Sequence, residues 1–130
     1  MSRNDIKNHL SIVQTIEPAN YQATETGTDV DLAGFDAAAV VITVGAATDT
    51  GFSFEVQEAD DDGTGAPDTY AAVAAADLDG TEPATAVAAA VTVLGYHGIK
   101  RWLRVVATDT GTGNADFGVA VVRGKGRVKP

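Results

Sequence analysis

The fold is decided by the stretch Phe52-Ser53-Phe54-Glu55-Val56-Gln57, in which apolar and polar side chains alternate without interruption. Successive side chains of a β-strand point to opposite faces, so this alternation is typical of a strand with one buried and one exposed side. The run 101–108 shows a similar mixture of apolar and polar residues. Both stretches predict strands that pack one face against a hydrophobic core and expose the other face to solvent.

Similar short segments follow one another along the chain. The expected strands are 11–16, 28–32, 39–44, 52–57, 101–108 and 117–122. β-Branched residues dominate these segments, whereas Gly, Asp, Asn and Pro dominate the gaps between them. The pattern predicts an all-β protein: an antiparallel, jelly-roll-like β-sandwich of about eight strands.

Two alanine-rich segments, 70–76 and 84–94, fit either a helix or a strand. Alanine is the best helix former, and the apolar residues of 84–94 recur at helical spacing. Val87, Val91 and Val93 also alternate as in a strand, and β-branched residues favour that structure. We expect a strand at 84–94.

The alternation also predicts which side chains fill the interior and where the domain ends. The expected core is Ile12, Val30, Leu32, Val40, Ile42, Val44, Phe52, Phe54, Val56, Leu103, Val105, Val119 and Val121. We expect an extended N-terminal arm at 1–10, a single sandwich domain at 11–122 and a basic C-terminal tail at 123–130, where Gly alternates with cations.

The charge is divided unevenly along the chain, whose formal net charge is −9. Residues 8–99 contain 15 acidic residues and no Lys or Arg, so the cations gather near the two ends. An acidic body repels phosphate backbones and anionic lipids, so we expect neither nucleic acid nor membrane as a partner. The sequence indicates neither a membrane-spanning segment nor a secretory signal.

The residue inventory disfavours catalysis. The chain has no cysteine, two histidines (His9 and His97) and three serines, none of which lies in a Gly-x-Ser-x-Gly motif. The glycine-rich run 111–116 lacks the final Gly of a dinucleotide fingerprint and lies between two expected strands. We therefore expect no enzymatic activity and no cofactor.

The three consecutive carboxylates Asp60, Asp61 and Asp62 are weak candidates for a calcium site. On the EF-hand pattern, the position of the bidentate Glu is occupied by Thr69, and the flanks resemble strands rather than helices. We expect a solvated hairpin loop and no bound metal.

The run 100–104 is the most informative polar cluster. Strand alternation places Lys100, Trp102 and Arg104 on one face, and Trp and Arg are favoured at binding interfaces. The alternative is that Trp102 lies in the core while the cations extend to solvent. The sequence leaves both interpretations open.

Several turn-rich stretches resemble small proteins that are encoded among the head genes of tailed bacteriophages and related prophages. The similarity is carried by 50–61, 77–83 (with Asp-Leu-Asp-Gly), 96–106 (with Lys-Arg-Trp-Leu-Arg-Val-Val), 108–113 and 121–124. The loop 62–68 is longer and poorer in aromatic residues than in that family.

The resemblance implies a capsid decoration, or cement, protein that binds the major capsid protein on the outside of the shell. It also implies a homo-oligomer, with a trimer favoured, that is made in the host cytoplasm and located on the virion surface. The family offers no catalytic residues. The expected interface residues are Arg3, Lys7, Lys100, Trp102, Arg104, Arg123, Lys125, Arg127 and Lys129.

Two other classes of function stay open. A host- or glycan-binding module displayed on the virion would need exposed aromatic residues, for which Tyr21, Tyr70, Tyr96 and Trp102 are the candidates. A tail or head–tail connector component would assemble into rings rather than decorate a shell.

Overall fold

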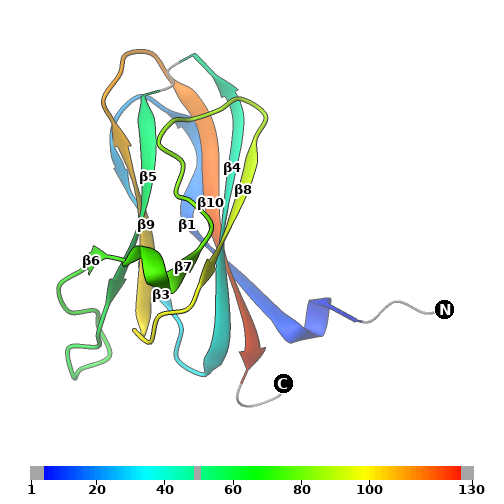
Figure 1. Ribbon diagram of the computed structural model, residues 1–130, viewed down its shortest axis with the longest axis vertical. Helices are drawn as coiled ribbons and strands as arrows, with labels where there is room; N and C mark the ends of the chain where they lie inside the picture. The colour runs from blue at the N-terminus through cyan, green and yellow to red at the C-terminus, as the bar shows by residue number, and fades with distance from the viewer. Residues whose placement is uncertain (1–4, 49–50, 127–130) are drawn as a thin grey trace.

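The structure, a computed structural model, describes residues 5–48 and 51–126 of the chain, which fold as two antiparallel sheets packed face to face (Figure 1). The strands are β1 (Leu10–Tyr21), β2 (Glu25–Thr26), β3 (Val30–Asp31), β4 (Phe35–Ala47), β5 (Phe52–Ala59), β6 (Ala71–Ala72), β7 (Leu78–Asp79), β8 (Val91–Tyr96), β9 (Trp102–Asp109) and β10 (Ala115–Gly126). Two single 3-10 turns accompany them, η1 (Lys7–His9) and η2 (Ala75–Asp77).

The strand order confirms the predicted sandwich. One sheet, called sheet A, has the order β1-β10-β4-β8-β7, and the other, sheet B, has the order β2-β9-β5-β6 with β3 also on β9. The antiparallel pairs β1·β10, β2·β9, β4·β8 and β5·β6 are nested, as if one long hairpin had been wound on itself. This is the connectivity of a jelly roll.

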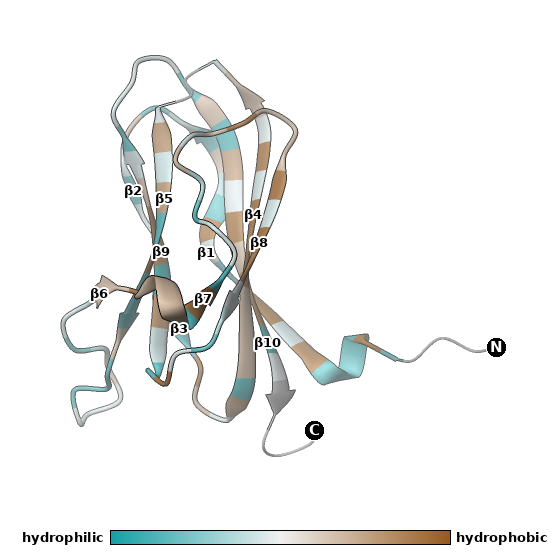
Figure 2. Ribbon diagram, viewed as in Figure 1, coloured by the Kyte–Doolittle hydropathy of each residue, from teal (hydrophilic) through white to brown (hydrophobic). Residues whose placement is uncertain are grey.

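The core lies between the sheets, where the expected alternation is observed. Figure 2 shows hydrophobic and hydrophilic residues alternating along β5. All of the predicted core residues except Ile12 are buried. Val40, Phe52 and Leu103 are fully enclosed.

The prediction for Ile12 is wrong, because this side chain is 62% exposed on the outer face of sheet A. In a regular strand Ile12 and Ile16 would share a face. The register against β10 shifts between Gln14 and Ile16, so Thr15 and Ile16 are both buried. The bulge therefore places the two isoleucines on opposite sides of the sheet.

An aromatic cluster joins the two sheets. The ring of Phe117, on β10, lies 4.7 Å from Tyr21, 5.0 Å from Phe52 and 5.1 Å from Phe54, measured between ring centroids. Phe117 is not among the predicted core residues. The other buried apolar residues outside the predicted core are Ile16, Ala59, Val73, Ala86, Leu94, Tyr96, Ala107 and Ala115.

The strand expected at 84–94 begins later, at Val91. Ala89 has a φ of 59°, in the left-handed region that interrupts an extended strand. Its N–H donates to the Gly45 carbonyl, and the Ala90 carbonyl accepts from Val44, so this loop is fixed to the end of β4. The segment 70–76 contributes the two-residue β6 and the start of η2.

Residues 123–126 of the expected basic tail belong to a strand, because β10 continues to Gly126. Gly124 pairs with Leu10 of β1 and with Ala37 of β4. The Arg123 guanidinium donates to the Asp31 carbonyl at 2.9 Å and to Ser11 Oγ at 2.6 Å. Residues 127–130 lie outside the described residues.

The described part of the N-terminal arm, residues 5–9, projects from the body (Figure 1). It contains η1, and the side chain of Ile6 is 65% exposed. Within the described ranges, no helix has the length and apolarity needed to cross a membrane.

We predict that Phe117→Ala lowers the free energy of unfolding by about 3–5 kcal/mol, because it leaves a cavity where the two sheets meet. Urea denaturation followed by circular dichroism measures this change. Val93→Ala is the control, since Val93 is 59% exposed and should change stability by less than about 0.5 kcal/mol. Equal effects of the two substitutions would contradict the role given to Phe117.

Candidate functional site

The outer face of sheet A is mainly apolar over three successive cross-strand rows, in which Gln14 and Thr43 are the polar residues. The rows are Ile12–Val122–Ala39–Gly95, Gln14–Ala120–Val41–Val93 and Gly118–Thr43–Val91. None of these residues is charged, although the chain as a whole has a net charge of −9. Small side chains predominate, so the backbone lies close to the surface of this face.

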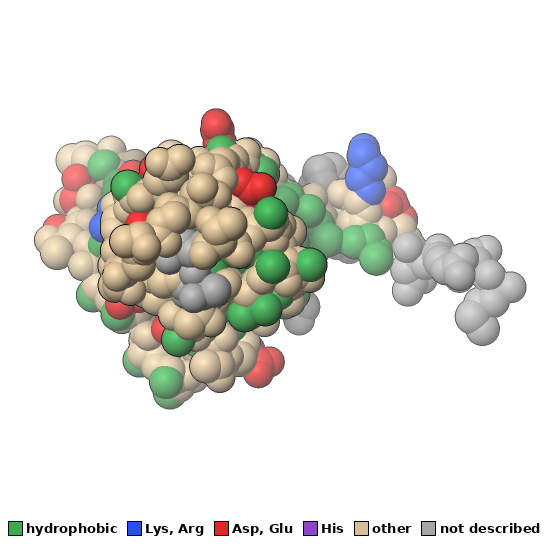
Figure 3. Space-filling view, turned by 90° about the horizontal axis from the view of Figure 1, so that it is seen from above, with side chains coloured by type: hydrophobic (Ala, Val, Ile, Leu, Met, Phe, Trp, Pro, Cys, Tyr) green, Lys and Arg blue, Asp and Glu red, His purple; other side chains and the backbone are tan. Residues whose placement is uncertain are grey.

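Several apolar side chains of this face are open to solvent. Val91 is 64% exposed, Val93 is 59% exposed, and nearby Val87 is 59% exposed. Figure 3 shows hydrophobic side chains on the side of the body from which the N-terminal arm projects. Contiguous exposed apolar surface on a folded domain marks an interaction site.

A groove of about 520 Å³ crosses the same face between β1, β10 and β4. Gly118 and Ala120 of β10 contribute to it, with Pro18 on one side and Val41 on the other. A Cβ atom added to Gly118 would lie 2.8 Å from Pro18 Cγ, so glycine is required for this close approach. Asp116, held by a 2.7 Å hydrogen bond from Asn20 Nδ2, is the charged residue that lines the groove.

The outer face of sheet B differs, because its polar groups are engaged with one another. Arg104 Nε donates to Gln57 Oε1 at 2.8 Å, and its guanidinium lies 4.0 Å from the Tyr70 ring. The Tyr70 hydroxyl donates to Asp29 at 2.8 Å. Burial, and next the hydrogen bond to Asp29, raise the pKa of Tyr70.

The basic residues Lys100 and Arg101, unlike Arg104, have acidic partners. Lys100 Nζ lies 2.7 Å from Asp60 Oδ2. Arg101 donates to both carboxylate oxygens of Asp31, at 2.9 and 3.0 Å, and lies 3.3 Å from Asp61 Oδ1. These cations therefore neutralise neighbouring carboxylates within the chain.

Trp102 is half-buried beside this network, and its indole N–H donates to Asp61 Oδ1 at 3.3 Å. The Arg101 guanidinium lies 5.1 Å from the indole centroid. The predicted interface residues Lys100, Trp102 and Arg104 thus lie close together on one side of the fold. Each of them already has a partner in the same molecule.

The other six predicted interface residues lie near the two ends of the chain. Lys7 is exposed in η1, and Arg123 points into the end of the sandwich and covers the Phe35 ring at 4.6 Å. Lys125 contributes backbone to β10. The other three predicted residues, Arg3, Arg127 and Lys129, lie outside the described residues.

Two of the three carboxylates at 60–62 accept hydrogen bonds from the hairpin loop, while the Asp60 carboxylate pairs with Lys100. Asp61 Oδ2 accepts from the N–H of Gly63, and Asp62 Oδ1 accepts from both the N–H and the hydroxyl of Thr64. These bonds, the side-chain bond first, lower the pKa of Asp62. Among the described residues, no group of three or more His, Cys, Asp or Glu side chains could hold a metal ion.

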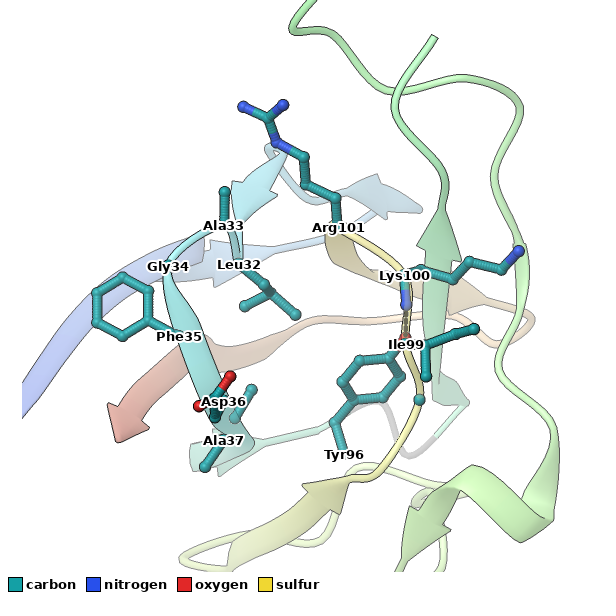
Figure 4. Close-up of a pocket in the computed structure, with 12 residues that line it drawn as sticks. Leu32, Ala33, Gly34, Phe35, Asp36, Ala37, Tyr96, Ile99, Lys100 and Arg101 are labelled. Atoms are coloured by element: carbon teal, nitrogen blue, oxygen red, sulfur yellow. Dashed lines mark hydrogen bonds between the residues drawn. The ribbon is translucent and has the colours of Figure 1, made fainter. Parts of the chain in front are cut away.

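A second hollow, of about 430 Å³, lies between the β3–β4 turn and the β8–β9 loop (Figure 4). The Tyr96 hydroxyl donates to Glu58 Oε1 at 2.7 Å and accepts from the Lys100 N–H at 3.2 Å. Figure 4 shows the side chains of Lys100 and Arg101 pointing away from the hollow. It is lined by parts of β4 and β8 and by the adjoining loops, and we assign no chemistry to it.

The aromatic residues considered for glycan binding are packed against protein groups. Tyr21 lies against Phe117, and Tyr70 lies under the Arg104 guanidinium. Tyr96 is 7% exposed, and Trp102 is half-buried. This arrangement offers little free aromatic surface on which a sugar ring could stack.

No family model matches this sequence, and no curated protein matches it. A structure of Bacillus endospore appendages, which form a novel family of disulfide-linked pili, has 12% identity and a TM-score of 0.39, with 96% of this chain and 98% of that chain covered. A structure of infectious bursal disease virus, strain Gx, has 11% identity and a TM-score of 0.45, with 92% of this chain and 34% of that chain covered. No residue role is transferred from either structure.

We predict that the Asp31–Arg101 pair stabilises the fold in a pH-dependent way. The hydrogen bond from Arg101 holds the pKa of Asp31 below its ordinary value of 3.8. The stabilisation is therefore complete above this value and is lost as the pH falls through the pKa of the folded state. The side chains are 36% and 38% exposed, so the effect is about 1 kcal/mol or less.

Urea denaturation from pH 6 down to pH 2 tests this prediction. Arg101→Gln should be less stable than wild type at pH 6, and the difference should shrink below about pH 4. Arg104→Gln is the matched control, because its hydrogen-bond partner Gln57 is uncharged. A difference for Arg101→Gln that is the same at every pH would refute the assignment.

Proposed function

We propose that this chain is a non-catalytic structural protein of a virion, which decorates and stabilises the outside of a tailed-phage capsid by binding the major capsid protein. The observation that carries the proposal is the uncharged outer face of sheet A on an acidic molecule. The sequence resemblance to phage head proteins supports the virion as its location, reached after synthesis in the host cytoplasm.

The chemistry of the face suits docking against another protein. Its rows contain mainly Gly, Ala, Val and Thr, so binding would bury apolar surface without removing charges from water. Burial of unpaired charges is costly, whereas a fully desolvated apolar centre contributes most of the affinity of typical interfaces. A modest contact of this kind becomes effective when many copies bind a repeating shell.

The charge distribution favours a protein partner over nucleic acid or membrane. The acidic body repels phosphates, and Lys100, Arg101 and Arg104 are engaged within the chain. We therefore assign the main contact to sheet A. The terminal cations expected from the sequence would add to it on an acidic shell.

We predict that Val93→Glu weakens binding to empty capsids of the encoding phage at least tenfold, because it places a carboxylate in the middle of the docking face. Occupancy is measured by co-sedimentation of purified protein with shells that lack it. Val93 is 59% exposed, so the variant should fold normally.

Thr108→Glu is the matched control for this experiment. It introduces the same charge at an exposed strand position on sheet B and should leave capsid occupancy unchanged. Equal binding of both variants and wild type would exclude the outer face of sheet A as the capsid contact. A map of the native particle without density for this protein on the shell would exclude decoration altogether.

A further inference from the structure

Residues 5–9 of the N-terminal arm expose side chains that are suited to contact with another protein surface. Ile6 is 65% exposed, and the adjoining Leu10 is 38% exposed, so apolar side chains face solvent along the arm. Within the arm, Asn8 Nδ2 donates to Asp5 at 2.7 Å. Lys7 is exposed, and no ion pair is found for it among the described residues.

The groove on sheet A offers the complementary chemistry. It is lined mainly by apolar and small residues, among them Ala120 of β10 and Val41 of β4. Asp116 is its charged lining residue, held at one end of the groove by Asn20. The exposed side chains of Ile6 and Lys7 match this lining in polarity and in charge, while Asp5 of the arm is held by Asn8.

We propose that the arm of one copy lies in the sheet A groove of a second copy, with Lys7 facing Asp116. This self-association goes beyond the proposed capsid contact and is tested without a capsid. The arm would cover the β1–β10 part of the face. The part near β8, with Val91 and Val93, would stay available for the shell.

The arm of the same molecule cannot make this contact. Asp116 pairs with Asn20, which lies ten residues along β1 from Leu10, a distance of about 30 Å at strand spacing. Lys7 precedes Leu10 by three residues, which span at most about 11 Å. Reaching its own Asp116 would require β1 to separate from β10, so the partner groove belongs to another copy.

The contact joins two different surfaces, the arm of one molecule and the groove of the next. Such a head-to-tail interface continues from copy to copy and either closes into a ring or extends as a filament. A closed ring of three would agree with the trimer that the sequence resemblance implies.

The test uses the full chain in sedimentation velocity over a range of concentrations at pH 7. Wild type should form oligomers as the concentration rises. Lys7→Glu and Asp116→Lys should each raise the dissociation constant at least tenfold, because each places like charges at the contact. The double variant K7E/D116K has the net charge of wild type and should associate again.

Mixing the two single variants provides the decisive measurement. The arm of the Lys7→Glu variant carries a carboxylate that fits the groove of the Asp116→Lys variant, which carries a cation. The mixture should therefore form oligomers in which the two variants alternate, although each variant alone associates more weakly than wild type. Glu55→Lys, on sheet B, is the matched control for Asp116→Lys and should associate as wild type does. Circular dichroism checks that every variant is folded.

Three results would overturn the proposal. They are a wild type that stays monomeric at all concentrations, single variants that associate like wild type, and a double variant or mixture that does not recover association. None of these results bears on capsid occupancy, so the proposed function stands or falls separately.

Discussion

The structure depends on the pairing of β10 with β1 on one edge and with β4 on the other. The strict alternation of side chains along β10 divides its residues between two environments. Phe117, Val119 and Val121 point into the sandwich, where Phe117 meets rings from both sheets. A slip of one residue would expose this whole set, so the buried aromatic cluster fixes the register.

The same alternation creates the surface to which we assign binding. Gly118, Ala120 and Val122, which alternate with these buried positions, are uncharged, and so are their neighbours on β4 and β8. On sheet B several outward residues are polar and form hydrogen bonds with one another, as Arg104 and Gln57 do. The polar groups on the outer face of sheet B therefore already have hydrogen-bond partners within the chain. The outer face of sheet A carries exposed apolar side chains, and covering them would remove apolar surface from water.

The sequence predicted the architecture well, because period-two alternation is a local property that residues such as Phe52 and Phe54 display directly. The predictions from sequence were wrong where contacts between residues distant in the chain determine the local conformation. The bulge that exposes Ile12 is visible only against β10, and the left-handed Ala89 is set by its bond to Gly45. The candidate face could not be predicted either, since its rows combine residues from four strands that are distant in sequence.

Pro18 and the two register shifts of β1 have a consequence for behaviour at high concentration. β1 is an edge strand of sheet A, and an uninterrupted edge strand is a template for amyloid-like stacking. Proline supplies no N–H to an incoming chain, and bulges spoil the regular spacing that such a chain requires. The C-terminal half of β1 is therefore a poor template for edge-to-edge aggregation. Many copies of the protein can be crowded together and stay folded.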